Sequence, residues 1–246
     1  MGIFDRFKNK PDAHDPLHAI IAKLGCECQI IREHDAQGVM TQYRQALAEG
    51  EREGFTPLII VPSDTIVDHV VMMSNEHDRE AILARANELD AVALLKKLVS
   101  ESMPEEEEEE LDIMGEFAVE EAALHHFVSI PQVLHQDILL AKIPTRNPWE
   151  AAAWVPMGGF NACPMPEEQV AVFKYWYEKY GARPGLVTSD VWELVVENPP
   201  RTQEEAAHLA LEQFGFCGDI VWQGVGSVNA LAGSLLDSPY WYFWWD

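Results

Sequence analysis

The C-terminal stretch Trp241-Tyr-Phe-Trp-Trp-Asp246 decides the fold, because five aromatic residues follow one another in it. Successive side chains of a β-strand point to opposite faces of the sheet. One face of the predicted strand carries Tyr240, Tyr242 and Trp244, and the other carries Trp241, Phe243 and Trp245. Large aromatic side chains dominate core energetics once they are buried. We therefore expect a strand that is covered on both faces, in the interior of a sheet or beneath other elements.

A second buried strand is predicted in the N-terminal half, at Thr56–Val61. Its portion Leu58-Ile-Ile-Val61 is a continuous apolar run, which is typical of a strand covered on both faces. A strand at Cys26–Ile31 precedes it, and the helix between the two begins at Asp35, whose carboxylate can cap the first turn, and ends at Gly54. A strand, a helix and a strand in this order predict parallel pairing of the two strands with a right-handed connection.

The C-terminal half supplies the remaining strands of the predicted sheet. We predict strands at Ile138–Ile143, Gly185–Thr188 and Val191–Glu197, the last two joined by a hairpin turn at Ser189-Asp190. Helical stretches lie between and around these strands. The predicted fold class is therefore α/β (α+β), with a mixed β-sheet of about six strands and helices on both faces.

Two helices carry clear start and stop signals. Thr202 and Glu205 form a capping box, in which each side chain accepts from a free backbone N–H of the first turn, and Gly215 is the predicted end of that helix. A longer helix is predicted from Asp78, with its apolar residues on one side, and Pro104 ends it.

An acidic segment separates the two halves of the chain. Glu105–Glu110 is an uninterrupted acidic run, which favours a solvated loop or a frayed helix end because like charges repel. Apolar residues return from Phe117 to Phe127 with the spacing of a helix. We expect residues 1–15 to be a mobile leader and residues 16–246 to be a single α/β domain, within which residues 64–132 are a helical, acidic insertion.

The charge of the chain excludes several classes of partner. With 41 acidic and 17 basic residues, the net charge is −24. Such a surface repels nucleic acids and anionic membranes, because contacts to phosphate require Lys and Arg. It attracts a basic protein or a cation, although charge of this size also serves solubility alone. We expect no nucleic-acid partner and no membrane association.

The compartment is predicted from three sequence features. The first residues lack the apolar run of a signal peptide, and no stretch has the ~20 apolar residues of a membrane span. Four cysteines in 246 residues do not suggest a disulfide framework. We therefore expect a cytoplasmic protein.

The cysteines do not form a recognisable metal or catalytic pattern. Cys26 and Cys28 stand two residues apart, which suits structural zinc poorly, because neighbours at this spacing on a strand do not easily close one tetrahedron. Cys163 lies in a loop rich in Gly and Pro, but the only histidine of the C-terminal part is His208, on a predicted helix. We predict no metal, no cofactor and no catalytic residue, and we expect a protein that is not an enzyme.

The stretch Gly224-Val-Gly226-Ser227 before the last predicted helix resembles a phosphate cradle, since N–H groups at a helix start attract anions. A dinucleotide fingerprint has a third glycine, and Asn229 stands at that spacing. A turn followed by a helix cap explains so short a match equally well.

A binding pocket is the remaining candidate site. Several tryptophans lie in or beside predicted loops with polar side chains that could orient a ligand, if these residues converge. The alternative is that the aromatic side chains are simply core. The candidate binding residues are Trp149, Trp154, Asn161, Cys163, Asp190, Trp192, Trp222, Gln223, Gly224 and Gly226.

Residues 137–246 resemble a known family in several ordered motifs. These are Pro148-Trp149, Gly158-Gly-Phe-Asn-Ala-Cys-Pro164, Tyr175-Trp-Tyr-Glu-Lys-Tyr-Gly181, Asp219-Ile-Val-Trp-Gln-Gly-Val-Gly226 and Trp241-Tyr-Phe-Trp-Trp-Asp246. The segment is similar to the bacterial domain-of-unknown-function family 4253, and Tyr43 with Thr56-Pro57-Leu58-Ile59 resembles its looser N-terminal part. The resemblance implies no activity, and it marks these positions as candidates for a role beyond packing.

Two functions remain open from the sequence. The first is a non-enzymatic module whose acidic face binds a basic protein, in the manner of an immunity or inhibitor protein, because complementary charge speeds such encounters. The second is a small-molecule-binding protein or an enzyme that uses the loops Gly158–Pro164 and Gln223–Ser227.

Overall fold

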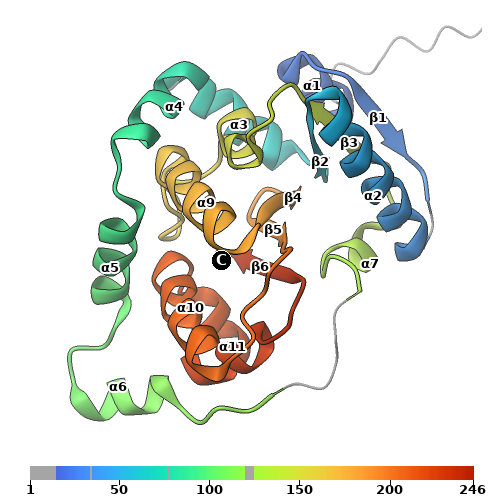
Figure 1. Ribbon diagram of the computed structural model, residues 1–246. Helices are drawn as coiled ribbons and strands as arrows, with labels where there is room; N and C mark the ends of the chain where they lie inside the picture. Colours follow the sequence, from blue (N-terminus) through green and yellow to red (C-terminus); the bar gives the residue numbers. More distant parts are fainter. Residues whose placement is uncertain (1–14, 34, 77, 120–124) are drawn as a thin grey trace, which may run out of the picture.

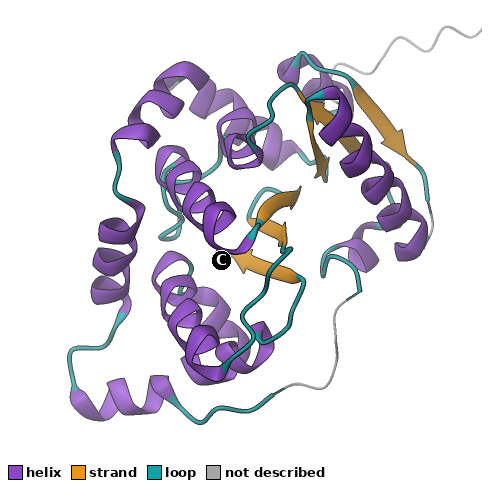
Figure 2. Ribbon diagram, in the orientation of Figure 1, coloured by secondary structure: helices purple, strands orange, loops and turns teal. Residues whose placement is uncertain are grey.

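The computed structural model describes residues 15–33, 35–76, 78–119 and 125–246 (Figure 1). The predicted leader, residues 1–15, lies outside these residues except for Asp15, which caps the first helix. Helices enclose the strands in the described part of the chain (Figure 2).

A single mixed sheet of six strands forms the centre of the described fold, as predicted. Its order is β1-β3-β2-β4-β5-β6. The strands are β1 (Cys28–Ile31), β2 (Thr56–Ile60), β3 (Ile138–Ile143), β4 (Arg183–Val187), β5 (Val191–Val195) and β6 (Tyr240–Trp244). The predicted hairpin is confirmed, because β4 and β5 pair antiparallel around the turn at residues 188–190.

The predicted parallel pairing of the first two strands is wrong. β3 lies between β1 and β2 and pairs antiparallel with both, so that Leu139 faces Ile30 on one side and Ile60 on the other. β3 is buried along nearly its whole length and suits this inner position, whereas β1 is partly exposed and suits an edge. Among the described strands, only β2 and β4 pair in parallel, through Ile59–Leu186 and Ile60–Val187.

Helices cover both faces of the sheet, as predicted. One face packs under α2 (Ala36–Glu53) and the short α7 (Ile130–Val133). The other face carries the larger core and the remaining described α-helices. These are α1 (Pro16–Leu24), α3 (Asp64–Glu76), α4 (Arg79–Glu88), α5 (Ala91–Ser102), α6 (Glu107–Met114), α8 (Ala151–Trp154), α9 (Pro166–Tyr180), α10 (Gln203–Phe216) and α11 (Val228–Leu235).

Helices α4 and α5 form an outer layer beside α9 and α10 (Figure 1). They contribute Ile82 and Leu95 to the same core that contains Trp176. Helices α4 and α5 therefore pack directly onto the C-terminal half through their apolar residues.

The predicted caps are confirmed, and three helix boundaries differ from prediction. Asp35 accepts from Gly38 N, and the capping box of Thr202 and Glu205 is complete. The helix predicted from Asp78 to Pro104 is two helices, because Asp90 caps a new one by accepting from the N–H groups of Val92 and Ala93.

Gly215 does not end its helix, which continues to Phe216. A Cβ atom at residue 215 would lie 2.6 Å from Val99 N, so this glycine allows α5 and α10 to approach closely. The acidic run lies partly in α6, and the described residues of the helix predicted at 117–127 are not helical. Ile220–Val225 is a π-helix.

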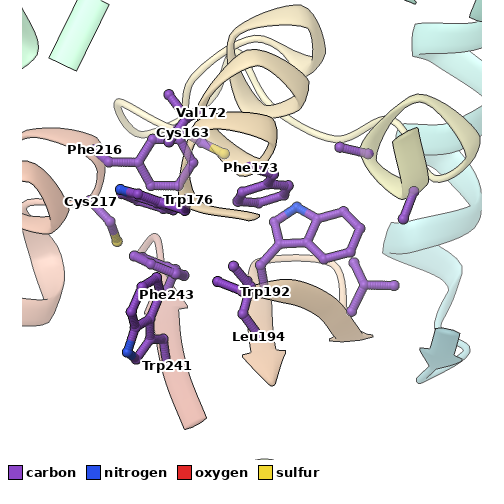
Figure 3. Close-up of a cluster of buried hydrophobic side chains, with 14 of the residues drawn as sticks. Cys163, Val172, Phe173, Trp176, Trp192, Leu194, Phe216, Cys217, Trp241 and Phe243 are labelled. Carbon is purple, nitrogen blue, oxygen red and sulfur yellow. The ribbon is translucent and has the colours of Figure 1, made fainter. Parts of the chain in front are cut away.

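β6 is an edge strand that is covered on both faces, so of the two predicted arrangements the structure has the second, cover by other elements. On one face Phe243 stacks on Trp176 with ring centroids 5.3 Å apart, and Trp241 lies 5.8 Å from the same ring (Figure 3). On the other face Tyr240 packs edge-on against Phe127 at 5.4 Å. Helices α9 and α10 and the segment before α7 supply this cover.

Candidate functional site

A polar pocket of about 300 Å³ lies at the carboxyl ends of the parallel strands β2 and β4. In open α/β sheets, ligands bind in the crevice outside the carboxyl ends of parallel strands, where the chain leaves in different directions. Here β2 leads into α3, whereas β4 turns back into β5. The pocket is completed by the α7 segment and by the end of β6.

The floor of the pocket is the tight turn between β4 and β5. The Asp190 carboxylate accepts from Thr188 Oγ1 at 2.7 Å and from Ser189 Oγ at 3.2 Å. Its other oxygen accepts from Trp244 Nε1 at 3.3 Å. Thr188 Oγ1 accepts from Val191 N at 3.0 Å, which closes the turn. These bonds hold the carboxylate in one orientation at the base of the pocket.

The wall formed by β2 is held in register with β4. Val61 N donates to Val187 O at 3.0 Å and extends the parallel pairing to the rim. Ser63 follows, and its hydroxyl caps the first turn of α3 by accepting from Ile66 N at 3.2 Å. A small hydroxyl residue occurs here because the first turn of a helix leaves N–H groups without backbone partners.

The opposite wall is anchored by a buried carboxylate. Glu193 on β5 is completely buried and accepts from the backbone N–H groups of Val128 and Ser129. Burial raises the pKa of Glu193, while these hydrogen bonds oppose the rise. The carboxylate thus ties Ser129 and the start of α7 to the sheet. Gln132 on α7 and Gln136, three residues after its end, complete this wall as exposed residues.

Tyr242 and Trp244 on β6 form the aromatic side of the pocket. Burial, followed by the nearby Glu193 and Asp190 carboxylates, raises the pKa of Tyr242 to about 12. The phenol therefore stays neutral near pH 7 and can both donate and accept a hydrogen bond. Trp244 is half-buried and presents an indole whose N–H is already directed to Asp190.

The lining determines what chemistry the pocket supports. Asp190 is the one charged residue among the residues that line it, and the lining has no Lys, Arg, His or Cys. Hydroxyl and amide groups supply the other polar atoms. This arrangement can bind and orient a ligand, but it lacks a nucleophile paired with a base. In the described part of the chain, no group of three His, Cys, Asp or Glu side chains is placed to hold a metal ion.

Of the predicted binding residues, Asp190 alone lines this pocket. Two others, Cys163 and Trp192, meet in the core around Gln169 (Figure 3). Trp192 is completely buried and donates through Nε1 to Gln169 Oε1 at 2.8 Å. Burial raises the pKa of the Cys163 thiol, so this cysteine remains a neutral, packed side chain.

The loop at residues 158–164 is held by internal hydrogen bonds. Gln169 Nε2 donates to Met157 O at 2.6 Å and to Pro164 O at 2.7 Å. Gly158 has φ 139°, and a Cβ there would lie 2.1 Å from Pro164 O. The glycines are therefore explained by a tight, internally bonded loop, from which Asn161 points outward as an exposed residue with φ 43°.

The remaining candidates have separate surroundings. Trp149 packs on Tyr177 with centroids 5.0 Å apart, and the Arg79 guanidinium lies 3.2 Å above the ring of Trp154. Trp222 is 54% exposed on the π-helix, which also carries the exposed Gln223 and Gly224. Gly226 follows with φ 83°, and Ser227 caps α11 by accepting from Ala230 N, as the turn-and-cap reading predicts.

Sequence reasoning missed most of the pocket. The strand pattern indicates only a packing role for Tyr242 and Trp244. Polar residues directly after two buried strands are the signal that points to such a site, since the carboxyl ends of parallel strands share one edge. The missed residues are Ser63, Ser129, Gln132, Gln136, Thr188, Ser189, Tyr242 and Trp244.

None of the described helices is both long enough and apolar enough to cross a membrane. No match was found among curated proteins or among solved structures. Residues 139–246 match the family model of a domain of unknown function, DUF4253. This segment holds the turn at Asp190, the buried Glu193 and the aromatic wall, whereas Ser63, Ser129 and the two glutamines lie before it. The C-terminal part of the chain, residues 139–246, is therefore similar to the DUF4253 family of domains of unknown function.

Proposed function

We propose that this protein binds a small polar molecule, neutral or positively charged, in the pocket at the carboxyl ends of β2 and β4. The observation that carries this proposal is a pocket of about 300 Å³ with one charged lining group, Asp190, surrounded by hydroxyl and amide groups. Small-molecule sites are concave and combine apolar walls with a few placed polar groups. An anionic ligand would meet the Asp190 carboxylate without a compensating cation in the lining.

The orientation of Asp190 favours a ligand that donates hydrogen bonds. An ionised carboxylate accepts at about four lone-pair positions. The turn and Trp244 use three of them, through Thr188, Ser189 and the indole N–H. One position remains for a hydroxyl, amine or amide N–H of a ligand. The faces of Tyr242 and Trp244 suit the apolar side of a sugar or nucleoside, or a cationic amine.

The test is a thermal-shift screen of the full chain against sugars, amino sugars, nucleosides and polyamines, followed by calorimetry on each hit. Asp190→Asn keeps the shape of the side chain but removes its charge and one acceptor. We expect it to weaken binding at least about tenfold, the loss expected for one charge-assisted hydrogen bond. Asp68→Asn, an exposed position on α3, is the matched control and should bind as the parent does. Hits that bind Asp190→Asn and the parent equally would contradict the proposal.

A second candidate function is the capture of a basic protein by the acidic surface. The net charge of −24 and the absence of any Lys or Arg between Lys97 and Lys142 favour it. Such charge steers a basic partner and raises its association rate. This role would be non-enzymatic and cytoplasmic, in the manner of an immunity or inhibitor protein.

A pull-down from the native host at low and high salt tests this second function. The bait is the parent chain or a variant with Glu→Gln at the exposed residues 105, 106 and 109. The control variant carries Glu→Gln at the exposed residues 53, 88 and 204. A basic protein that elutes with salt and is lost only in the first variant supports the function. If no basic protein elutes with salt, the function is abandoned.

A further inference from the structure

We infer that a second pocket, at the opposite ends of the strands β2 and β4, binds a small organic anion that carries a carboxylate or a phosphate. This pocket has a volume of about 230 Å³ and lies at the amino ends of β2 and β4. The end of α2, the loop after β3 and Tyr177 near the end of α9 surround it. It shares no lining residue with the pocket of the proposed function.

Two guanidinium groups meet in this pocket, although the chain has only 17 basic residues against 41 acidic ones. Arg183 is the first residue of β4, and its side chain is 18% exposed. Arg146 reaches the pocket from the loop between β3 and the Pro148–Glu150 turn. Arginine is the residue that best recognises carboxylates and phosphates, because its planar fork can donate two parallel hydrogen bonds.

The position of Arg146 depends on a glycine. Gly54 ends α2 with φ 90°, and a Cβ at this residue would lie 2.7 Å from Arg146 Nη2. The guanidinium therefore lies against the backbone at the end of the helix, where a side chain would displace it. In the described part of the chain, Arg146 has no ion pair and no hydrogen bond. Its donors are available to a ligand.

The existing partners of Arg183 are distant and exposed. Its Nη1 lies 3.6 Å from Glu51 Oε1, and its Nη2 lies 3.4 Å from Glu197 Oε2. Strong guanidinium–carboxylate hydrogen bonds are about 2.7–2.9 Å long. Both glutamate side chains are about two-thirds exposed, at 69% and 67%. Of the two, only Glu51 lines the pocket, so two positive charges face one negative charge there.

The walls of the pocket suit a ligand with a flat apolar body. Phe55 and Tyr177 line it together with three prolines. The Arg183 guanidinium lies 5.6 Å from the Tyr177 ring centre, and Trp149 packs on the same ring at 5.0 Å. Trp149, a predicted binding residue, thus supports the wall of this pocket. A ligand with an aromatic or heterocyclic ring and one anionic group matches this lining.

The experiment is an NMR titration of the full chain with phenyl phosphate, benzoate and inorganic phosphate, at constant ionic strength set with sodium chloride. We expect phenyl phosphate or benzoate to shift the backbone amides of Gly54 and Tyr177 in a saturable manner. Comparing phenyl phosphate with benzoate shows whether the pocket prefers a phosphate or a carboxylate group. Inorganic phosphate should bind more weakly than phenyl phosphate, because it does not contact the aromatic wall.

Three variants separate a binding role from a structural one. Arg146→Gln should weaken binding about tenfold, because the guanidinium contact is lost. Glu51→Gln should tighten binding about threefold, since it removes the carboxylate that competes for Arg183. Arg52→Gln, a neighbouring exposed arginine that does not line the pocket, should change affinity less than about twofold.

Several outcomes would overturn the inference. One is the absence of a saturable shift at up to about 10 mM of both organic anions, which lies beyond the millimolar limit of weak specific binding. Another is equal affinity of the parent and Arg146→Gln, with both folded as judged by their amide spectra. Weaker binding in Glu51→Gln would show that the Arg183–Glu51 pair is structural. Equal binding of inorganic and phenyl phosphate would exclude the aromatic wall from the site.

Discussion

Replacing Gln169 by leucine tests how the core and the 158–164 loop are held together. Gln169 lies on α9 and is completely buried. Its amide nitrogen donates to Met157 O at 2.6 Å and to Pro164 O at 2.7 Å, and its oxygen accepts from Trp192 Nε1 at 2.8 Å. One side chain therefore joins a helix, a loop and the strand β5.

The size of the effect follows from these three bonds. Leucine has a similar volume but leaves two carbonyl groups and one indole N–H buried without partners. Each such group costs about 1–3 kcal/mol. Because the loop can relax in part, we expect the free energy of unfolding to fall by about 3–6 kcal/mol, against a total of about 5–15 kcal/mol for a typical protein. For a chain of this length, the melting temperature should fall by roughly 10–20 °C.

The assay is thermal and urea unfolding of the parent and of Gln169→Leu, followed by far-UV circular dichroism and tryptophan fluorescence. Gln203→Leu, at an exposed position of α10, is the control for a general effect of the substitution and should melt within about 2 °C of the parent. Trp192 fluorescence should shift to the blue in Gln169→Leu, because its indole N–H loses a hydrogen-bond acceptor and an apolar side chain takes its place.

A Gln169→Leu protein that melts within about 2 °C of the parent would refute this reasoning. So would an unchanged emission maximum together with a lower melting temperature, because the loss would then arise elsewhere. Gln169→Glu provides a further check. Burial would raise the pKa of the new carboxyl group. The loss of stability of Gln169→Glu relative to the parent should therefore be smallest at low pH and should grow as the pH rises through that pKa.

Three further predictions concern the fold. Truncation after Pro239 removes the covered strand β6 and should abolish cooperative unfolding, since losing large aromatics costs about 3–5 kcal/mol each; cooperative melting near the parent temperature would contradict the packing of β6. Gly215→Ala should lower stability by about 1–2 kcal/mol in urea unfolding, because its Cβ would lie 2.6 Å from Val99 N, although alanine favours a helix; a gain would show that α5 moves freely. The pKa of Glu193 is raised in the folded protein, so its contribution to the free energy of unfolding is fully present below its ordinary pKa of 4.5 and is lost as the pH rises through the folded value. The stability of the parent relative to Glu193→Gln should therefore fall over that range. A difference in stability between the two proteins that stays constant from pH 4 to 8 would contradict this prediction.

Local features of the fold could be predicted because they depend on residues close together in the chain. The caps at Asp35, Ser63 and Thr202 follow from the unpaired N–H groups at any helix start. The alternation in Trp241–Asp246 predicted burial of both faces, since the period of a strand is two. Gly215 misled the prediction, because a glycine that ends a helix and one that admits a neighbouring helix look alike in sequence.

The functional site was less accessible to sequence reasoning. Asp190 was identified as a candidate because it occupies a turn between two strands. Its partners Ser63 and Ser129 are more than 60 residues away in the chain, and nothing in the local pattern links them. The tryptophans drew attention by their size, but Trp192 is in the core and Trp222 is at the surface. Residue type indicates the chemistry a side chain offers, whereas its neighbours decide how that chemistry is used.

The sequence by itself determined the fold class, the number of strands, most helix starts and the burial of the final aromatic strand. Each of these depends on hydrophobic period or on capping within one or two turns. Only the tertiary structure decided that β3 lies between β1 and β2, which makes β2 and β4 the parallel neighbours whose ends enclose the two pockets. Strand order is set by the packing of segments far apart in the chain, and a local pattern carries no record of which distant segments meet.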